Sequence, residues 1–568
     1  MVKDVSIYDE LGEERKQLQE DGKLPAWVTT VAWQMLKENY LSDKYPDLKS
    51  VYVRVASHAA RYTSNQVLWE NKFFDLLWNG YLAASTPVLS NMGTGIGCPV
   101  SCSGGVVGDS VYSFYDAQKE AAVLSKNGFG TSGYLGNIRP RGSRIAGIKG
   151  AASGVLPVFK DFVQMSRDIS QGSQRRGAWA GYIEIDHDDF YELVNYISKN
   201  PDDANIGWNV SNKFIERLDA GDKDAIERYQ KALKLKMISG KGYFEFIDKV
   251  NDQNPQMYKD RNLTVKASNL CSEIQLFSDE DHTFSCVLSS MNASLYDEWK
   301  DTDAVFDATV FLDCVNQDLI EIGKKTQGME KVVRFATKSR ALGLGMLGFH
   351  TYLQENMIPF ESMDAYYKNI EIFQHLNNET IRASQWMSKE WGEPLWCKGY
   401  GLRNTHRIAI APNLSSALIC GSVSQGIEPI YKNAYVQNTA AGKMDRVNPT
   451  LLKLMKEKDI YNDETVKNII NNNGSVQHVD WLDDHEKSVF KTAFEIDQKQ
   501  IIRLASARQR YIDQAQSINL FFSADEDESY ISEVHKLAFK DPYIKSLYYI
   551  RSESGVNVSK GECIACHG

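Results

Sequence analysis

The chain has 568 residues, of which 43% are hydrophobic and 24% charged, and its formal net charge is −10. Its length exceeds that of an ordinary single domain, and its acidic balance excludes a general nucleic-acid-binding protein, because neutralising phosphates requires clustered Lys and Arg. The charged N-terminus contains no signal-peptide core, and no apolar run approaches the roughly 18 residues of a membrane helix, so we expect a cytoplasmic protein with no membrane partner.

The order of apolar and polar segments predicts an α/β fold. Apolar residues at helical spacing, as in WVTTVAWQMLKENYL, predict a helical N-terminal layer over residues 1–75. From about residue 80 to 450, short apolar runs alternate with helical segments and glycine-rich turns, and RIAIAP is a late example of such a run. We also take VYVRVA, at residues 51–56 and so ahead of this range, as an early run of the same kind. Residues 455–500 favour helices, with NNNGS as a turn and DDHEKSVFKTAFEI as an amphipathic helix.

The stretch LGLGMLGFH contains a G-x-G-x-x-G pattern at Gly343, Gly345 and Gly348. A dinucleotide-binding fingerprint follows directly on a buried strand. The preceding residues, VVRFATKSRA, are polar and basic and suit a helix better. We therefore interpret these glycines as permitting close helix packing, and the pattern alone does not indicate a dehydrogenase.

The nine cysteines are odd in number and scattered, which favours reduced thiols with redox or catalytic roles over a disulfide framework. Two stretches hold four of them. ASTPVLSNMGTGIGCPVSCSGGVVGDS contains Cys98 and Cys102, and NLCSEIQLFSDEDHTFSCVLSSMNAS begins with residues 269–274 and continues to Cys286. Each cysteine taken alone fits a small buried apolar residue.

Two later stretches also carry candidate chemistry. APNLSSALICGSVSQGIEP is a small-residue turn whose serines and backbone N–H groups suit a phosphate. The tail KSLYYIRSESGVNVSKGECIACHG has adjacent tyrosines and ends in C-x-x-C. The terminal cysteines and His567 supply only three of the four ligands of a structural zinc site, and thiols on a terminus are well placed to reach another group.

Together and in this order, the four stretches resemble the catalytic large subunits of class I ribonucleotide reductases from about residue 80 to the C-terminus. NLCSEI matches the family's thiyl-cysteine loop, and RYIDQAQSINLFF and RALGLGMLG are also family-like. The resemblance implies an α/β barrel of ten strands, arranged as two antiparallel halves of five parallel strands with a central finger loop. It divides the chain into a helical layer without an ATP-cone (1–75), the barrel (76–545), and the end of the radical-relay strand with a mobile redox tail (546–568).

The resemblance also assigns roles in radical chemistry at a ribose. Cys271 becomes the thiyl radical that takes the 3′ hydrogen, Glu273 is the general base for the 3′ hydroxyl, and Asn269 bonds the ribose hydroxyls. Cys102 and Cys286 form the dithiol that supplies two electrons and becomes a disulfide. Cys98 competes for the first of these two positions, and the family's spacing to the Asp-Ser pair at residues 109–110 selects Cys102.

Delivery of the radical and of reducing equivalents is assigned to the tail. Tyr548 and Tyr549 relay the radical from a small metal-bearing beta subunit, so this chain needs no tightly bound cofactor and no metal of its own. Cys563 and Cys566 exchange with the buried disulfide and are reduced by thioredoxin or glutaredoxin. The implied reaction is reduction of ribonucleoside diphosphates to deoxyribonucleoside diphosphates for DNA synthesis.

Ligand sites follow from the same resemblance. The substrate-binding candidates are Thr86, Ser101, Asn413, Ser415 and Ser416. Leu414 stands where relatives carry Ala or Glu, so backbone contacts are expected at that position. The candidates for a dNTP or ATP effector with Mg²⁺ are Asp109, Ser110, Arg139 and Ile145. The loop that passes the effector's identity to the substrate site contains Gln171, Arg175 and Arg176. The family's effector site lies at a subunit interface, so a homodimer is expected.

Three alternatives remain on the sequence. A cobalamin-dependent ribonucleotide reductase shares the fold and the cysteines but does not need the tyrosine pair. A non-catalytic nucleotide-binding regulator would not need Cys271. A plain thiol-disulfide oxidoreductase would need only the terminal cysteines and would leave residues 269–273 unexplained.

Overall fold

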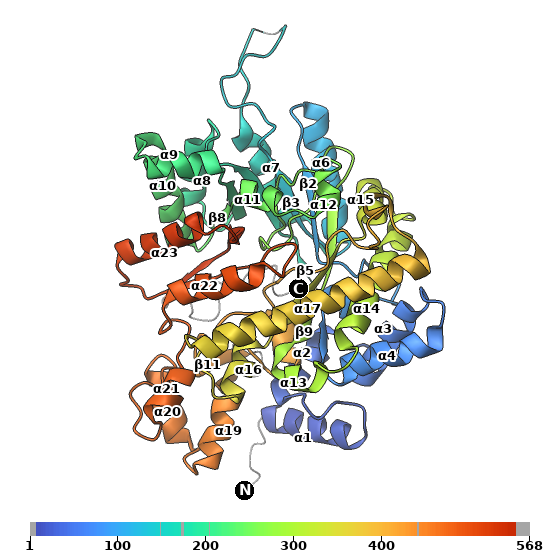
Figure 1. Ribbon diagram of the computed structural model, residues 1–568, viewed down its shortest axis with the longest axis vertical. Helices are drawn as coiled ribbons and strands as arrows, with labels where there is room; N and C mark the ends of the chain where they lie inside the picture. Colours follow the sequence, from blue (N-terminus) through green and yellow to red (C-terminus); the bar gives the residue numbers. More distant parts are fainter. Residues whose placement is uncertain (1–6, 148, 172–174, 204, 440–441, 553–568) are drawn as a thin grey trace.

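The computed structural model describes residues 7–147, 149–171, 175–203, 205–439 and 442–552 (Figure 1). Four helices form the expected N-terminal layer: α1 (Ile7–Glu20), α2 (Thr30–Asn39), α3 (Leu48–Ala60) and α4 (Gln66–Trp78). VYVRVA lies within α3, so its interpretation as a strand-like run is wrong. A capping box between Asp47 and Ser50 starts this helix, and the buried face that includes Val51 and Val55 outweighs the β preference of valine.

The first half of the barrel is a sheet of five parallel strands. In spatial order they are β2 (Cys102–Val106), β3 (Gly130–Tyr134), β6 (Trp179–Glu184), β7 (Asn205–Asn209) and β8 (Tyr243–Glu245). Such strands are buried on both faces and need helices outside them. The helices near this half are α6 (Val111–Lys126), α7 (Val155–Asp168), α8 (Phe190–Lys199), α9 (Asn212–Asp219) and α10 (Lys223–Ser239) (Figure 1).

The second half runs parallel within itself but antiparallel to the first. β9 (Phe284–Asn292) pairs with β10 (Leu342–Leu347). The ladder continues by bridges from Leu344 to Ile408 and from Ile410 to Gln516. The segment after Gln516 leads into β13 (Leu520–Phe522), which pairs in parallel with β15 (Ile550–Ser552). RIAIAP is thus an extended member of the sheet, as expected.

Two antiparallel seams join the halves. At one seam β2 pairs with β9, and at the other β8 pairs with β14 (Ser546–Leu547). The short strand β1 (Leu82–Ala84) adds to the same edge of β9 as β2. When the bridged segments at residues 407–411 and 516–522 are counted as members, each half has five strands, and the expected ten-stranded arrangement is confirmed.

The glycines of the G-x-G-x-x-G pattern in LGLGMLGFH belong to the barrel. Gly343 and Gly345 lie in β10, directly after α15 (Glu330–Ser339), so their interpretation as helix-packing residues is wrong. A Cβ on Gly343 would lie 2.5 Å from Leu288 Cδ2 and 2.8 Å from Cys286 Sγ. The missing side chain therefore allows β10 to approach β9 closely beside Cys286.

The remaining helices pack outside the second half. The long helix α17 (Met363–Trp391) crosses the molecule diagonally in Figure 1 and contacts the buried α14 (Ala304–Gly323). At the lower left, α19 (Pro449–Glu457), α20 (Asp463–Asn471) and α21 (Asp484–Val489) share a separate hydrophobic cluster. In DDHEKSVFKTAFEI only the six residues of α21 are helical, so that predicted helix is too long.

The other elements complete the description. They are α5 (Thr86–Asn91), α11 (Ile247–Asp252), α12 (Gln256–Lys259), α13 (Tyr296–Trp299), α16 (Phe349–Glu355), α18 (Leu414–Ile419), α22 (Gln498–Gln509), α23 (Glu528–Lys540), and the hairpins β4 (Ser170–Gln171) with β5 (Arg175–Arg176) and β11 (Ala434–Thr439) with β12 (Gly442–Val447). Within the described ranges, no helix combines the length and apolar character that a membrane crossing requires.

Candidate active site

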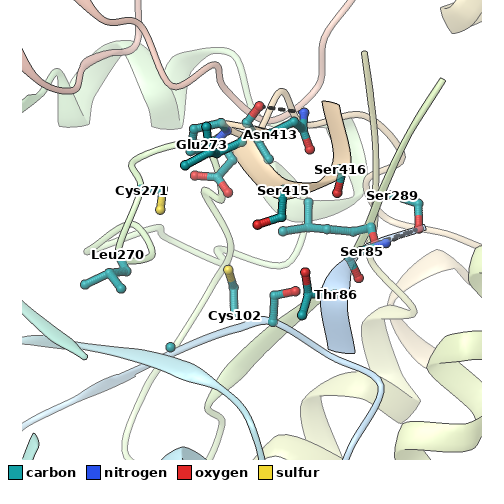
Figure 2. A pocket seen from close by; sticks show the side chains of 16 residues that line it. Ser85, Thr86, Cys102, Leu270, Cys271, Glu273, Ser289, Asn413, Ser415 and Ser416 are labelled. Atoms are coloured by element: carbon teal, nitrogen blue, oxygen red, sulfur yellow. Dashed lines mark hydrogen bonds between the residues drawn. The ribbon is translucent and has the colours of Figure 1, made fainter. Parts of the chain in front are cut away.

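A cavity inside the barrel gathers most of the residues predicted to be catalytic or substrate-binding (Figure 2). Its lining includes Thr86, Ser101, Cys102, Cys271, Glu273, Asn413, Ser415 and Ser416. In Figure 2 the sulfurs lie toward one side, and the hydroxyl groups of Thr86, Ser415 and Ser416 lie toward the other. One wall of the cavity therefore offers thiols, and the opposite wall offers hydrogen-bonding groups.

Cys271 sits on a loop that is tied to both halves of the barrel. The loop follows α12 and is buried over residues 267–276. From the first half, Tyr182 Oη donates to the Asn269 carbonyl at 2.6 Å. From the second half, Ser517 Oγ donates to the Cys271 carbonyl at 2.6 Å, and Ser546 Oγ donates to the Ser272 carbonyl at 2.9 Å. This is the expected finger loop at the centre of the barrel.

A tyrosine pair leads directly to Cys271. The hydroxyl of the fully buried Tyr548 donates to Cys271 Sγ at 3.4 Å, and the rings of Tyr548 and Tyr549 lie 4.0 Å apart between centroids. Tyr243 on β8 packs 4.9 Å from the Tyr548 ring and donates to the Tyr549 hydroxyl at 3.3 Å. Lys236 donates to the Tyr548 carbonyl, and burial lowers the pKa of this ammonium to about 7. The tyrosines and the cysteine thus form one continuous path that is buried at its inner end and half-buried at Tyr549.

Cys102 and Cys286 face each other across the seam between β2 and β9. Residues directly opposite in an antiparallel pair have Cβ atoms about 4.5–5.5 Å apart, close to the roughly 3.5–4.5 Å of a disulfide. Burial raises the pKa of the Cys286 thiol well above its ordinary value, and the nearby Cys102 and Glu273 raise it further against a hydrogen bond from Gln514. Cys286 is therefore held as a neutral thiol, and its position opposite Cys102 allows the two sulfurs to close into a disulfide after a small movement.

The competing cysteine lies elsewhere. Cys98 is buried, its backbone N–H donates to the Asn127 carbonyl, and its side chain is absent from the lining of the cavity. Burial raises the pKa of its thiol to about 12. The geometry thus favours Cys102 over Cys98 as the partner of Cys286.

Asn269 and Glu273 face the thiols from the finger loop. Asn269 Nδ2 donates to Cys102 Sγ at 3.2 Å, while its Oδ1 accepts the backbone N–H of Glu273 at 3.1 Å. The Glu273 carboxylate accepts from Ser517 Oγ at 3.1 Å and is almost fully buried. A carboxylate in this position is within reach of a proton on a ligand in the cavity.

The opposite wall is built from two short helices that begin at the cavity. Thr86 starts α5, and its hydroxyl bonds the hydroxyl of Tyr40 at 2.8 Å. Asn413 caps α18 and accepts from Ser290 Oγ at 3.2 Å. Backbone N–H groups at helix N-termini and adjacent hydroxyls are suitable partners for phosphate oxygens, so this wall could hold the phosphate end of a nucleotide.

The predicted effector residues lie away from this cavity. Arg139 Nε donates to the Asp109 carboxylate at 2.6 Å, and Ser110 caps the N-terminus of α6. Ile145 is half-buried in the segment between β3 and α7. Gln171 and Arg175 are paired across the β4–β5 hairpin, next to Arg176.

The terminal cysteines of the predicted shuttle lie outside the described residues. No group of three or more metal-ligating side chains was found among the positions that the structure covers.

Two family models cover nearly the whole chain. The ribonucleotide reductase barrel domain matches residues 100–226, 223–396 and 396–550, and the ribonucleotide reductase all-alpha domain matches residues 27–97. The chain belongs to the ribonucleotide reductase large-subunit family. The all-alpha match covers most of the residues expected to form the helical N-terminal layer.

Relatives of this ribonucleotide reductase chain match it over most of its length. A frog virus 3 (isolate Goorha) protein, named as a ribonucleoside-diphosphate reductase large subunit, is 33% identical over 95% of this chain and 99% of its own. The ribonucleoside-diphosphate reductase large subunit of invertebrate iridescent virus 3 is 29% identical over 93% of this chain and 94% of its own. Among solved structures, the class Id ribonucleotide reductase alpha subunit of Actinobacillus ureae superposes with a TM-score of 0.86 at 38% identity, covering 95% of this chain and 99% of that one.

Sequence reasoning misses three residues that contact the cysteines or the tyrosine pair, namely Tyr243, Gln514 and Ser517. Gln514, Gln516 and Asn519 lie close together in RYIDQAQSINLFF, and this was an available signal, because several amides in a buried extended segment need partners. For Tyr243 only its position in an apolar strand was visible.

Proposed function

We propose that the chain is the catalytic large subunit of a ribonucleoside-diphosphate reductase. The carrying observation is the approach of the Tyr548 hydroxyl to within 3.4 Å of Cys271 Sγ, beside a cavity that also exposes Cys102 to a ligand. A thiol-disulfide oxidoreductase has no need of a tyrosine path to a third cysteine. A regulator has no need of a dithiol at its binding site.

The cavity accommodates each chemical step. The Cys271 thiyl takes the 3′ hydrogen of the ribose, while Glu273 accepts the 3′ hydroxyl proton. The 2′ hydroxyl leaves as water, and Cys102 and Cys286 supply the two electrons and two hydrogens of the reduction as their S–S bond forms. Cys271 then returns its hydrogen to the 3′ carbon. The phosphate end of the substrate lies on the wall formed by Thr86 and α18.

The radical comes from a small metal-bearing beta subunit. The similarity to a class Id alpha subunit supports this origin, and Tyr549, which is only half-buried, provides the outer end of the path. A cobalamin-dependent reductase would not require the tyrosine pair. The tail cysteines Cys563 and Cys566 would then return electrons from thioredoxin or glutaredoxin, which implies a reducing compartment such as the cytoplasm.

A homodimer is supported by the exposed face of α6. Val111, Tyr112 and Tyr115 are 66%, 89% and 60% exposed on this helix, and a groove separates it from α7. Large apolar side chains gathered on one helix mark an interaction site. Pairing of two copies there would place Asp109 and Ser110, at the start of α6, near the interface, where a dNTP with Mg²⁺ would set substrate specificity.

An assay with CDP and dithiothreitol tests the proposal. The purified chain should form dCDP only when the candidate metal-bearing partner subunit is added. Formation of dCDP with adenosylcobalamin and without the partner would instead establish the cobalamin-dependent alternative. A deoxynucleoside triphosphate should change the relative rates with CDP, ADP, GDP and UDP. Absence of reduction under all these conditions would refute the proposed function.

A further inference from the structure

The sulfur of Cys286 is buried and contacts groups on several sides. It is fully buried, and its S–H donates to the Val287 carbonyl at 3.7 Å. Gly343 leaves space on its β10 side, where a Cβ would approach to 2.8 Å. On another side Gln514 Nε2 donates to the sulfur at 3.5 Å. The Gln514 side chain therefore directs an N–H group at the sulfur of Cys286 from a different segment of the second half-barrel.

The orientation of the Gln514 amide is fixed by its other bonds. Its Oε1 accepts the backbone N–H of Gln275 at 3.2 Å, and its Nε2 also donates to the Leu342 carbonyl at 2.8 Å. A flipped amide would place an oxygen against the Leu342 carbonyl and an N–H against the N–H of Gln275. Both contacts would be repulsive, so the N–H group must face Cys286.

Cys102 has a matching donor on the finger loop. Asn269 Nδ2 lies 3.2 Å from Cys102 Sγ, and its Oδ1 is fixed by the backbone N–H groups of Glu273 and Ile274, each at 3.1 Å. The two thiols of the pair are thus each approached by one locked side-chain amide. These amides come from different segments of the chain, and both bond backbone N–H groups of the finger loop.

We propose that Gln514 is a catalytic residue of the dithiol, which holds Cys286 Sγ and stabilises the negative charge that this sulfur carries while the disulfide forms. This inference rests on the proposed function. In the net step, a C2′–OH and two thiols become a C2′–H, water and one S–S bond, so a thiol must lose its proton before or as the sulfurs join. An N–H donor favours the thiolate over the thiol, because hydrogen bonds to charged groups are the stronger ones.

The groups that face Cys286 make such a donor necessary. Burial opposes ionisation of the thiol, and Cys102, Glu273 and Asp513 all disfavour a negative charge on its sulfur. The hydrogen bond from Gln514 acts in the opposite direction and favours the charged sulfur. Its removal should therefore weaken the polar support of the thiolate.

The test compares Gln514→Met with Gln509→Met in the full chain. Gln509 is also buried in the same region and donates to the Ile512 and Gln514 carbonyls, so its loss matches the structural disturbance without removing the donor to the sulfur. The prereduced proteins are treated with methyl methanethiosulfonate over a range of pH, and labelling of each cysteine is followed by peptide mass spectrometry. We expect labelling of Cys286 at neutral pH to fall about tenfold or more in Gln514→Met. Its pH profile should shift to higher pH, while Gln509→Met labels like the wild type.

Equal labelling of Cys286 in Gln514→Met and Gln509→Met overturns the proposal. If Gln514→Met does not fold, Gln514→Glu decides, because its carboxylate keeps the acceptor for Gln275 and replaces the donor at the sulfur; wild-type labelling in that variant also overturns it. Labelling does not depend on turnover. Wild-type protein that forms no dCDP with its partner subunit therefore refutes the proposed function separately from this inference.

Discussion

Replacement of Gly343 by Ala tests whether the reaction requires Cys286 in its present position. A Cβ at residue 343 would lie 2.8 Å from Cys286 Sγ and 2.5 Å from Leu288 Cδ2. Unstrained contacts begin near about 3.5 Å, so the sulfur has to shift by roughly 0.7 Å. Overpacking of this kind costs about 1–3 kcal/mol of stability. A misplacement near 1 Å lowers a catalytic rate by about a hundredfold. We therefore expect the rate of dCDP formation in a single turnover of the prereduced protein to fall about tenfold or more.

The assay measures a single turnover of CDP reduction without external reductant. Prereduced protein is mixed with the partner subunit and CDP, and both dCDP and the disulfide between Cys102 and Cys286 are measured after rapid quenching. The control is Gly323→Ala in α14, where a Cβ would meet Val333 Cγ2 at 2.5 Å and its three nearest neighbours are all carbon atoms. If Gly343→Ala forms the disulfide as fast as Gly323→Ala at similar thermal stability, the reasoning is refuted.

Four further variants address other parts of the molecule. Cys271→Ser and Tyr548→Phe should each abolish partner-dependent dCDP formation with little change in melting temperature, because the packing is kept; activity in either variant would contradict the assigned path. Changing both Cys563 and Cys566 to Ser should stop thioredoxin-supported turnover but spare the first round, and loss of that round would disprove the shuttle. Burial disfavours the Asp313 carboxylate, but its two arginine partners prevail and lower its pKa to about 2, so its contribution of roughly 2 kcal/mol is present above about pH 4 and lost as pH falls through 2. Asp313→Asn should lower the free energy of unfolding by about 3–5 kcal/mol and flatten its pH dependence between pH 4 and 2 in denaturant titrations.

Much of the site was predictable because several of its residues lie close together in the sequence. The residues of NLCSEI lie on one tight loop, so their proximity could be expected from their spacing alone. The α/β class followed from alternating runs such as RIAIAP, which does lie in the barrel at residues 407–412. The pairing of Cys102 with Cys286 rested on resemblance to the family, and the register of β2 and β9 now gives it a geometric basis.

The errors arose where tertiary packing outweighs local preference. Val51 and Val55 favour strands intrinsically, but they are four residues apart and both face the core from α3. Gly343 and Gly345 were predicted to allow close helix packing because the segment before them is helical. In the structure they lie in β10, and their small size lets this strand pack closely against its neighbours. Gln514 could not be assigned a role, since its partners come from Gln275, Cys286 and Leu342, far away in the chain.

The two seams of the barrel separate the two groups of residues with proposed redox roles. At the seam between β2 and β9, antiparallel register sets Cys102 opposite Cys286. At the seam between β8 and β14, the chain leaves β14 directly into Tyr548 and Tyr549. The finger loop lies between them, with Ser272 in the left-handed region at φ 68° and its carbonyl held by Ser546. A non-glycine residue adopts that conformation only where its surroundings enforce it. In the proposed function, radical entry and disulfide formation are therefore assigned to opposite seams, and the hydrogen bonds that fix the loop hold Cys271 between them.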